Sequence, residues 1–412
     1  MTPAKGYAKM KDSGIEWVGM IPATWDVFPA GGVFDEVKEK NVNNQYSNPF
    51  SFRYGEIVDK KIAGEIDESV EETLSAYRVV SPNTIMINGL NLNYDFISQR
   101  VAIVREKGII TSAYLAVQPD EGRIVPRFVL YLLKAYDYRQ VFHGVGSGIR
   151  KTLKFQDFKS IKIVAPSLTE QTAIASYLDA QCAKIDEIIA QAKASIEDYK
   201  QWKASIIYEA VTKGLNPNVE MKDSGIEWIG RMPAHWTAPA LKHLCTMQAG
   251  KNLISEQIST SGEYPVYGGN GQRGYYSDYN ANGNFLLVGR QGALCGNVHY
   301  VSGKFWATEH AVVTTPSKIT NIRYLYYLLI AMDLNQYASN SAAQPGLSVG
   351  NILTVKTLLP PIGEQVRISE FLDNGCPKID EVITEKQSLI DDLESYKKSL
   401  IYEVVTGKRY IR

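Results

Sequence analysis

The chain contains one ten-residue segment twice, and this repeat constrains its architecture more than any other feature. MKDSGIEWVG occupies residues 10–19 and MKDSGIEWIG occupies residues 221–230, an offset of 211 residues. A second set of matches has an offset of 194 residues: it runs from Glu170-Gln171 to Ile207-Tyr208-Glu209 and again from Glu364-Gln365 to Ile401-Tyr402-Glu403. The stretches between the matches differ. Because internal repeats are a primary indicator of architecture, the sequence predicts a duplicated scaffold that carries two different inserts.

The repeats divide the 412 residues into six segments. They are a junction at 1–25, a first insert at 26–166, a first scaffold helix at 167–214, a second junction at 215–236, a second insert at 237–360 and a second scaffold helix at 361–412. A chain of this length is expected to hold two to four domains of about 100 to 200 residues. We therefore predict an α+β fold with a pseudo-two-fold internal repeat, in which two mixed α/β inserts are joined by two long helices. Function is expected in the inserts.

Two long helices are predicted, one after Pro166 and one after Pro360-Pro361, because proline favours a helix start. Their apolar residues recur at helical spacing and form a narrow stripe. The helices are expected to break near Asp179 and Pro377, and to continue for about four heptads each as an antiparallel coiled coil. An ordinary hairpin or a homodimer seam is the alternative. A helix of roughly 30 residues would span about 45 Å, or roughly 13 base pairs of duplex DNA.

Four of the six tryptophans belong to the two junctions, namely Trp17 and Trp25 in the first copy and Trp228 and Trp236 in the second. Tryptophan buries a large area when it is packed. Its recurrence at fixed spacing in both copies favours packing anchors that join each insert to the scaffold over residues that stack on a ligand.

The charge of the chain is balanced overall but not locally. Since the formal net charge is zero, binding to a polyanion has to depend on local patches. Residues 35–72 contain ten acids and five bases, whereas residues 84–165 contain twelve bases and six acids. In the first insert, the residues expected to hold phosphates or read base edges are Asn88, Asn91, Asn93, Arg100, Arg105, Arg150, Lys151 and Lys154. A solvated lysine-rich face is the alternative.

The second insert is rich in glycine and aromatic residues, with the segments PVYGGNGQRGYY at 265–276 and VGRQGALCGN at 288–297. Such loops bring backbone close to a partner. The side chains that could contact base edges, sugars or phosphates are Asn270, Arg273, Tyr275, Tyr276, Arg290, Gln291, Asn297, Lys304 and Trp306. The glycines could equally form turns in a β-rich domain.

Several classes of site lack their sequence signatures. The five histidines form no H-E-x-x-H pair, and the four cysteines form no C-x-x-C pair. We therefore expect buried free thiols and neither a metal site nor a cofactor. The glycine-rich segment 144–148 does not match a nucleotide-binding loop, and Asn48-Pro49-Phe50 lacks the second proline of an adenine methyltransferase motif. Without a signal peptide or a long apolar run, the chain is expected to be a cytoplasmic binding protein.

The order of the segments resembles the specificity (S) subunit of Type I restriction-modification enzymes. The resemblance rests on Pro-x-x-x-Glu-Gln at the start of both helices, on the Ser-Gly-Ile-Glu-Trp-x-Gly junction and on the variable regions between them, and it covers nearly the whole chain. Residues 265–310, with Tyr267-Gly-Gly-Asn-Gly and Phe305-Trp-Ala-Thr-x-His310, also look like a recurrent type of target recognition domain.

The resemblance implies that each insert reads one half of a bipartite, asymmetric DNA target and that the helices set the gap. It also implies two modification subunits, which carry S-adenosylmethionine and methylate adenine at N6, and restriction subunits that translocate and cleave DNA with ATP. In this interpretation none of that chemistry lies on the present chain. The alternative is a duplicated coiled-coil scaffold whose inserts bind protein or carbohydrate, which would lack the salt dependence of DNA binding.

Overall fold

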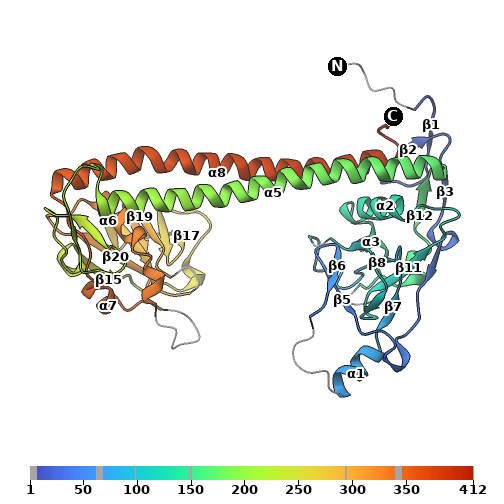
Figure 1. The fold of residues 1–412 in the computed structure, drawn as a ribbon, viewed down its shortest axis with the longest axis horizontal. Coiled ribbons are helices and arrows are strands. Elements are labelled where there is room, and N and C mark those ends of the chain that lie inside the picture. Colours follow the sequence, from blue (N-terminus) through green and yellow to red (C-terminus); the bar gives the residue numbers. More distant parts are fainter. Residues whose placement is uncertain are drawn as a thin grey trace. The chain divides into compact units, whose positions relative to one another are not determined.

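The computed structural model describes residues 7–61, 68–97, 99–146, 148, 151–292, 295–338 and 346–411. The chain divides into two compact units. Unit 1 consists of Met1–Gln191 and Ser388–Arg412, and unit 2 consists of Ala192–Gln387. Each unit therefore contains one insert together with a stretch of both long helices, α5 (Leu168–Lys213) and α8 (Ile362–Val405) (Figure 1).

The insert of unit 1 contains two four-stranded sheets among its described residues. The first has the strand order β6 (Glu56–Asp59), β5 (Pro49–Arg53), β10 (Gly108–Ile110), β7 (Arg78–Val80). The second has the order β4 (Phe34–Glu36), β11 (Leu115–Pro119), β8 (Ile85–Ile87), β9 (Val101–Ile103). Phe50, Val80 and Ile110 of the first sheet form one buried cluster with Met86 and Ala116 of the second, so that the two sheets share a core.

Short elements complete unit 1. Two-stranded sheets are formed by β1 (Met10–Asp12) with β2 (Met20–Pro22), and by β3 (Asp26–Pro29) with β12 (Lys162–Ala165). The helices are α1 (Glu68–Ser75), α2 (Pro126–Tyr138), α3 (Val141–Val145) and α4 (Phe155–Phe158). Pro126 at the first position favours the start of α2, and the left-handed backbone of Gln140, with φ of 56°, separates α2 from α3.

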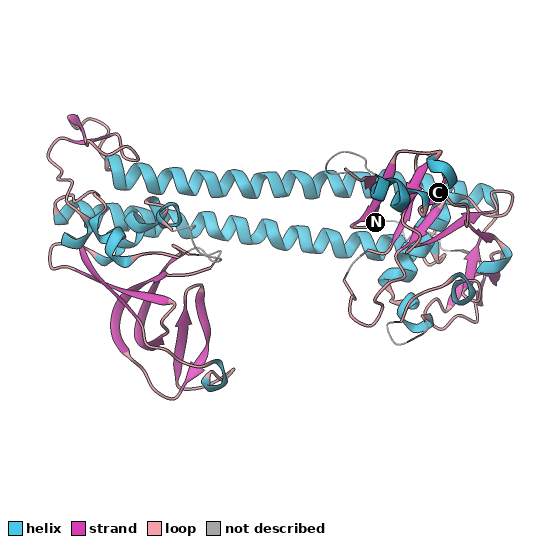
Figure 2. Cartoon of the chain, turned by 90° about the horizontal axis from the view of Figure 1, so that it is seen from below, coloured by secondary structure: helices cyan, strands magenta, loops and turns pink. Residues whose placement is uncertain are grey.

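The insert of unit 2 is built on a six-stranded sheet with the order β15-β20-β18-β19-β16-β17, drawn in magenta in Figure 2. These strands are β15 (Cys245–Ala249), β16 (Tyr264–Gly268), β17 (Gly271–Tyr276), β18 (Ala281–Gly289), β19 (Val298–Ala307) and β20 (Ala311–Pro316). The other elements of unit 2 are β13 (Met221–Asp223), β14 (Arg231–Pro233), α6 (Ile322–Ala331) and α7 (Val349–Thr354). Alternate residues of β18 belong to different cores: Leu286 and Val288 to the cluster that includes α6, and Leu287 to a second cluster with Phe305.

Within each unit, a stretch of α5 packs against a stretch of α8 in the antiparallel sense. In unit 1, Asp186 of α5 pairs with Lys397 of α8 at 2.6 Å. In unit 2, Lys203 of α5 pairs with Asp380 of α8 at 2.6 Å, and the Nζ of Lys386 lies 5.7 Å from the ring centroid of Tyr199. The predicted fold class, with two mixed α/β inserts joined by two long helices that pack together, is confirmed.

The expected helix breaks near Asp179 and Pro377 are wrong, since both helices are continuous across these positions. The Asp179 carboxylate accepts hydrogen bonds from Arg127 and Tyr131 of α2, so it does not compete for the helix backbone. Pro377 removes one backbone donor, a loss of about 3 kcal/mol or more. Cys376, which belongs to the buried cluster that includes α6, and Ile379 are both buried and pack the helix around this position.

The repeated segments occupy equivalent places in the two units. In unit 2, the Tyr208 hydroxyl near the end of α5 donates to the Trp228 carbonyl at 2.8 Å. In unit 1, the equivalent bond runs from Tyr402, near the end of α8, to the Trp17 carbonyl at 2.9 Å. The end of α8 therefore occupies in unit 1 the place that the end of α5 occupies in unit 2. Both ends of the described chain meet in unit 1, where the rings of Tyr7 and Tyr410 are 5.2 Å apart.

The Glu-Gln pair at the start of each long helix joins three segments. The indole Nε1 of Trp25 donates to Glu170 at 3.2 Å, and that of Trp236 donates to Glu364 at 2.9 Å. Both indoles are completely buried, as expected for packing anchors. The glutamine that follows accepts the backbone N–H at the start of the insert's helix, from Val125 to Gln171 and from Asn321 to Gln365, at 2.7 Å in both copies.

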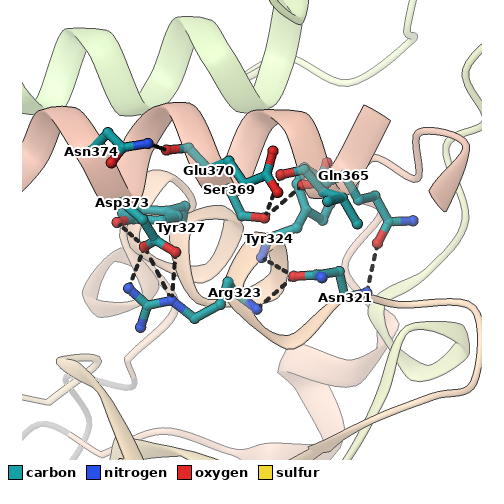
Figure 3. A network of polar contacts seen from close by, with 10 residues as sticks. Asn321, Arg323, Tyr324, Tyr327, Gln365, Ser369, Glu370, Asp373 and Asn374 are labelled. Carbon is teal, nitrogen blue, oxygen red and sulfur yellow. Dashed lines mark hydrogen bonds and ion pairs between the residues drawn. The ribbon is translucent and has the colours of Figure 1, made fainter. Parts of the chain in front are cut away.

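A second contact between insert and scaffold lies about two helical turns after the Glu-Gln pair, and it occurs in both units. In unit 2, Arg323 and Tyr327 of α6 both bind the Asp373 carboxylate of α8, with the tyrosine hydroxyl at 2.7 Å (Figure 3). In unit 1, Arg127 and Tyr131 of α2 bind Asp179 in the same way. These contacts orient each insert on the scaffold and leave the opposite parts of the insert available for function.

Candidate nucleic-acid interface

Three of the predicted residues of the second insert meet at one end of its sheet. Asn270 lies in the turn between β16 and β17, while Arg290 and Asn297 lie in the connection between β18 and β19. The Asn297 amide donates to the Asn270 side-chain oxygen at 3.3 Å. Gly269 lets the β16–β17 turn come close to the neighbouring backbone, because a Cβ there would lie 3.0 Å from the His310 carbonyl oxygen and 3.7 Å from the backbone nitrogen of Arg290.

A second arginine, Arg273, lies beside this group. The Arg273 side chain lies across Gly268, where a Cβ would come within 2.6 Å of its Cδ. The side chains of Arg273 and Arg290 are exposed, and no carboxylate within the described residues forms an ion pair with either. An exposed guanidinium group that forms no such ion pair can bind phosphate or the acceptor edge of guanine.

Arg290 and Gln291 also line a cavity of about 590 Å³. Its wall is held by a hydrogen bond from the Leu347 nitrogen to the Arg290 carbonyl at 2.9 Å and by the pairing of Gln291 with Gly346. Gln248 of β15 and Ser348 complete the polar lining. These two residues were not predicted, because neither belongs to a glycine-rich or basic segment. The order of the strands brings Gln248 beside Arg290, and the pairing of Gln291 with Gly346 brings Ser348 there.

The aromatic candidates lie at the other end of the β16–β17 hairpin. Tyr276 pairs with Tyr264 in that hairpin, and its ring contacts Trp306 edge to face at 5.2 Å. The Trp306 indole donates to the Lys251 carbonyl at 3.2 Å. Lys304 lies over the rings of Tyr264 and Tyr279, and the Tyr275 backbone pairs with Ser259. The structure therefore does not bring these four residues together with Arg290.

In the first insert, the predicted residues fall largely on the loop between β8 and β9. Arg100 is completely buried there, and its guanidinium donates to the carbonyls of Asn88 and Leu90 at 2.8 Å and to that of Asp95 at 2.5 Å. The prediction that Arg100 contacts DNA is therefore corrected. Its donors satisfy backbone acceptors and hold the loop in one conformation.

The neighbouring asparagines and lysines form a continuous surface around this loop. Asn91 is exposed, Asn88 and Asn93 are half-buried, and Lys151 and Lys154 are exposed. The loop pairs with the lysine segment through bonds from the Leu92 nitrogen to the Lys151 carbonyl, at 3.1 Å, and from the Leu153 nitrogen to the Gly89 carbonyl, at 2.9 Å. Arg150 lies outside the described residues.

The remaining basic residues of this insert do not extend that surface. Arg105 follows β9, at the end of the strand opposite to Arg100. Arg127 pairs with Asp179, the Arg139 guanidinium lies 4.3 Å from the Tyr402 ring centroid, and Lys162 donates to the Gly14 carbonyl. Much of the positive charge counted in the sequence thus serves internal contacts.

Other kinds of site were searched for in the described part of the chain. No group of three or more His, Cys, Asp and Glu side chains there could hold a metal ion, and no helix there is long and apolar enough to cross a membrane. All four cysteines are buried free thiols, as expected. Burial raises the pKa of the Cys245 thiol to about 12.

Comparison with known proteins places these observations in a family. The family model for the Type I restriction modification DNA specificity domain matches residues 22–198 and 233–389. The EcoprrI specificity subunit of Escherichia coli is 46% identical over 137 residues, which are 32% of this chain and 34% of that protein. That alignment thus spans about a third of the relative. The putative MjaX specificity subunit of Methanocaldococcus jannaschii is 22% identical over 417 residues, 95% of either chain.

Two solved structures have a similar fold. One belongs to work on the structural basis of complex assembly and conformational transition of the type I R-M system. Its matching chain has a TM-score of 0.71 and 15% sequence identity, and the match covers 93% of this chain and 98% of that one. The HsdS subunit of Thermoanaerobacter tengcongensis has a TM-score of 0.50 and 14% identity, covering 94% of this chain and 98% of that one.

Proposed function

The chain belongs to the Type I restriction-modification DNA specificity family, and from this premise we propose that it reads a bipartite, asymmetric DNA target with one half per insert. Membership confirms the resemblance seen in the repeats: this is a specificity subunit, the non-catalytic component that recognises DNA within a Type I restriction-modification complex. The halves of the target, the residues that read them and the partner subunits are our proposals.

The observation that supports base reading most directly is the group formed by Asn270, Arg290 and Asn297. Arginine can bind guanine through its O6 and N7, and asparagine can bind adenine through its N6 and N7. The contact between the two asparagines sets their amides beside each other. The glycines around them let backbone come close to a partner. We assign the cavity beside Arg290 and Gln291 to the same half-site.

The asymmetry of the target is supported by the difference between the inserts. The unit 1 insert has two four-stranded sheets among its described residues, whereas the unit 2 insert has one six-stranded sheet. A loop held by buried Arg100 bears Asn91 in unit 1, whereas the tips of two hairpins bear Asn270 and Arg290 in unit 2. Surfaces this different are not expected to read the same bases, so a palindromic target is not expected.

We further propose that the two long helices set the number of bases between the half-sites. The scaffold stripe is narrow: Cys182, Ile185 and Ile189 in unit 1 and Ala192 and Ile196 in unit 2 are buried at alternating spacings of three and four residues. This heptad spacing is typical of a coiled coil, whose length grows by about 1.5 Å with each residue.

We propose that the chain assembles with two methyltransferase subunits, which use S-adenosylmethionine, and with ATP-dependent restriction subunits, in the cytoplasm. Large apolar side chains on the long helices remain exposed in both units and offer surfaces for helical partners. In unit 1 these include Ile188, Leu389 and Tyr396, and in unit 2 they include Trp202 and Phe371. Each unit has one such set, which supports one methyltransferase subunit per unit.

The proposal is tested by methylome sequencing of a host that expresses the chain with its methyltransferase partner. A single bipartite motif with two unequal halves and a constant gap is expected. Exchange of residues 237–360 for another insert should change one half only. A palindromic motif, or binding by the purified complex that does not prefer one duplex and does not weaken as salt rises, would reject the assignment.

A further inference from the structure

The hairpin between β5 and β6 in unit 1 ends in an unusual residue. Tyr54 and Gly55 form its two-residue turn, with φ of 49° and 75° respectively. A turn with two positive φ values favours asparagine followed by glycine, and a bulky residue is strained in the first position. The Tyr54 side chain is 91% exposed. Neither the turn nor the core of unit 1 therefore explains why a tyrosine stands here.

A second exposed apolar residue lies close to this turn. Ile97 is 95% exposed and belongs to the loop that buried Arg100 holds. The turn and the loop are in contact, because a Cβ at Gly55 would lie within 2.8 Å of the Gln99 side chain. Next to Ile97, the Phe96 ring stacks on His143 with ring centroids 4.9 Å apart. Phe96 and Tyr94 of the same loop are also exposed, by 53% and 76%.

Polar and basic residues of the candidate interface in unit 1 lie near the loop that bears Ile97. The His143 carbonyl accepts from the Lys151 ammonium at 3.5 Å. Arg53, at the base of the turn, is exposed; Glu56, opposite it in the hairpin, is the nearby acid. The Tyr54 turn and the Ile97 loop, which contact each other, thus present exposed apolar side chains on the insert that also bears the lysine and asparagine candidates.

We propose that Tyr54 and Ile97 enter the major groove of the first half-site and contact the 5-methyl group of thymine. This inference rests on the proposed reading of DNA by the chain. The thymine methyl is the apolar group that the edges of the base pairs present in the major groove. A two-residue hairpin tip is narrow enough to enter that groove, which admits a two-stranded ribbon.

A protein partner is the other possible occupant of an exposed apolar tip. A stable protein interface buries about 800 Å² per partner, and its core is depleted of charged residues, whereas exposed Arg53 and Glu56 flank the Tyr54 turn. The neighbouring lysine and asparagine side chains are instead complementary to the phosphates and base edges of DNA. DNA therefore accounts for both parts of the surface.

The test uses the complex of the full chain with its methyltransferase subunit and short duplexes that carry the methylome-defined target. In the first half-site each thymine is replaced in turn by uracil, which lacks only the methyl group. Tyr54→Asn keeps a residue suited to the turn, and Ile97→Ser shortens an exposed side chain, so both variants are expected to fold. Val42→Ser, at a site that is also exposed in unit 1, is the control.

For the wild type, uracil at one thymine should weaken binding about four-fold, as expected for one methyl group lost from an apolar contact. The Tyr54→Asn or Ile97→Ser complex should bind the thymine duplex correspondingly less well and lose its preference for thymine over uracil. The Val42→Ser complex should retain that preference.

Three results would overturn the inference while leaving the proposed function intact: variants that bind as the wild type does, uracil substitutions without effect, and a first half-site without thymine. Variants that bind DNA normally but no longer retain the methyltransferase subunit would identify the tip as a protein contact and also overturn it. Failure of the proposed function is distinguished by the wild-type complex, which would then show no preference for the target.

Discussion

The Nζ atom of Lys203 lies 2.6 Å from Oδ2 of Asp380, and the same pair recurs as Lys397 and Asp186 at 2.6 Å. The first pair joins α5 to α8 within unit 2, and the second joins α8 to α5 within unit 1. Both partners recur at the offset of 194 residues. The two helices have therefore exchanged roles between the units, as the pseudo-two-fold relationship requires.

Reversal of one charge in the unit 2 pair should destabilise the chain modestly, and reversal of both should restore it. Lys203 and Asp380 are partly exposed, so the pair is expected to contribute about 0.2 to 1 kcal/mol. Urea unfolding of Lys203→Asp, Asp380→Lys and the double variant measures the coupling. The same exchange at Lys397 and Asp186 should give a similar value, and a zero coupling energy in both cycles would contradict a role in helix pairing.

Replacement of Gln365 by leucine should destabilise the attachment of the second insert strongly. The Gln365 side chain is completely buried; its oxygen accepts from the Asn321 nitrogen, and its amide donates to the Ile319 and Pro360 carbonyls. The variant leaves these groups buried without partners, at about 1 to 3 kcal/mol for each group. Urea unfolding should show a loss of several kcal/mol, whereas Gln191→Leu on the exposed helix surface should show little change.

Arg290→Ala and Lys151→Ala should weaken DNA binding in different ways. If Arg290 reads a base edge, its removal should cost about 1 to 3 kcal/mol and relax one position of one half-site. If Lys151 binds phosphate, its removal should weaken all sequences alike and reduce the salt dependence. Titration of target and single-mismatch duplexes at several salt concentrations separates the outcomes. Equal weakening on every duplex by Arg290→Ala would reassign that residue to the backbone.

The stability of unit 1 should fall as pH rises from about 4 to about 6 because of Asp137. Burial raises the pKa of this carboxyl from 3.8 to about 6, although the Arg100 N–H and guanidinium oppose the shift. Between these values the folded chain binds more protons than the unfolded chain, so the unfolding free energy decreases with rising pH. The unfolding free energy of the wild type should therefore decrease with rising pH relative to that of Asp137→Asn, which lacks the titrating carboxyl. A difference that does not change with pH would contradict it.

Insertion of four residues, about one helical turn, at equivalent places in α5 and α8 should lengthen the gap between the half-sites by roughly two base pairs. The bases read in each half should stay the same, because neither insert is altered. Methylome sequencing gives the gap directly, and insertion in α5 alone is the control because it disturbs the register of the pair. An unchanged gap after the matched insertion would reject the helices as the spacing element.

Sequence patterns were most informative where a local feature suffices. The repeated junction, the apolar stripes and the prolines before both helices predict the duplicated scaffold, and the Ser-Gly-Ile-Glu-Trp junction with Pro-x-x-x-Glu-Gln predicts the family. The burial of Trp25 and Trp236 also follows, since a large side chain that recurs at fixed spacing is an anchor. The glycine-rich segments of the second insert lie in and between strands of a six-stranded sheet, and their approach to a partner stays a prediction.

Tertiary structure decided which charged and polar side chains remain available. Arg100 and Arg290 are chemically equal in the sequence, but the first is buried against the carbonyls of a loop and the second is exposed beside a cavity. Gln248 reaches that cavity only through the order of the strands, and Ser348 reaches it only through the pairing of Gln291 with Gly346. The helices continue past Asp179 and Pro377 because contacts from α2 and the packed scaffold outweigh the local preference to break. Local sequence patterns determine which elements form, and the motifs shared with a known family indicate which family the chain belongs to, whereas the use of each hydrogen-bonding group depends on the neighbours that folding brings to it.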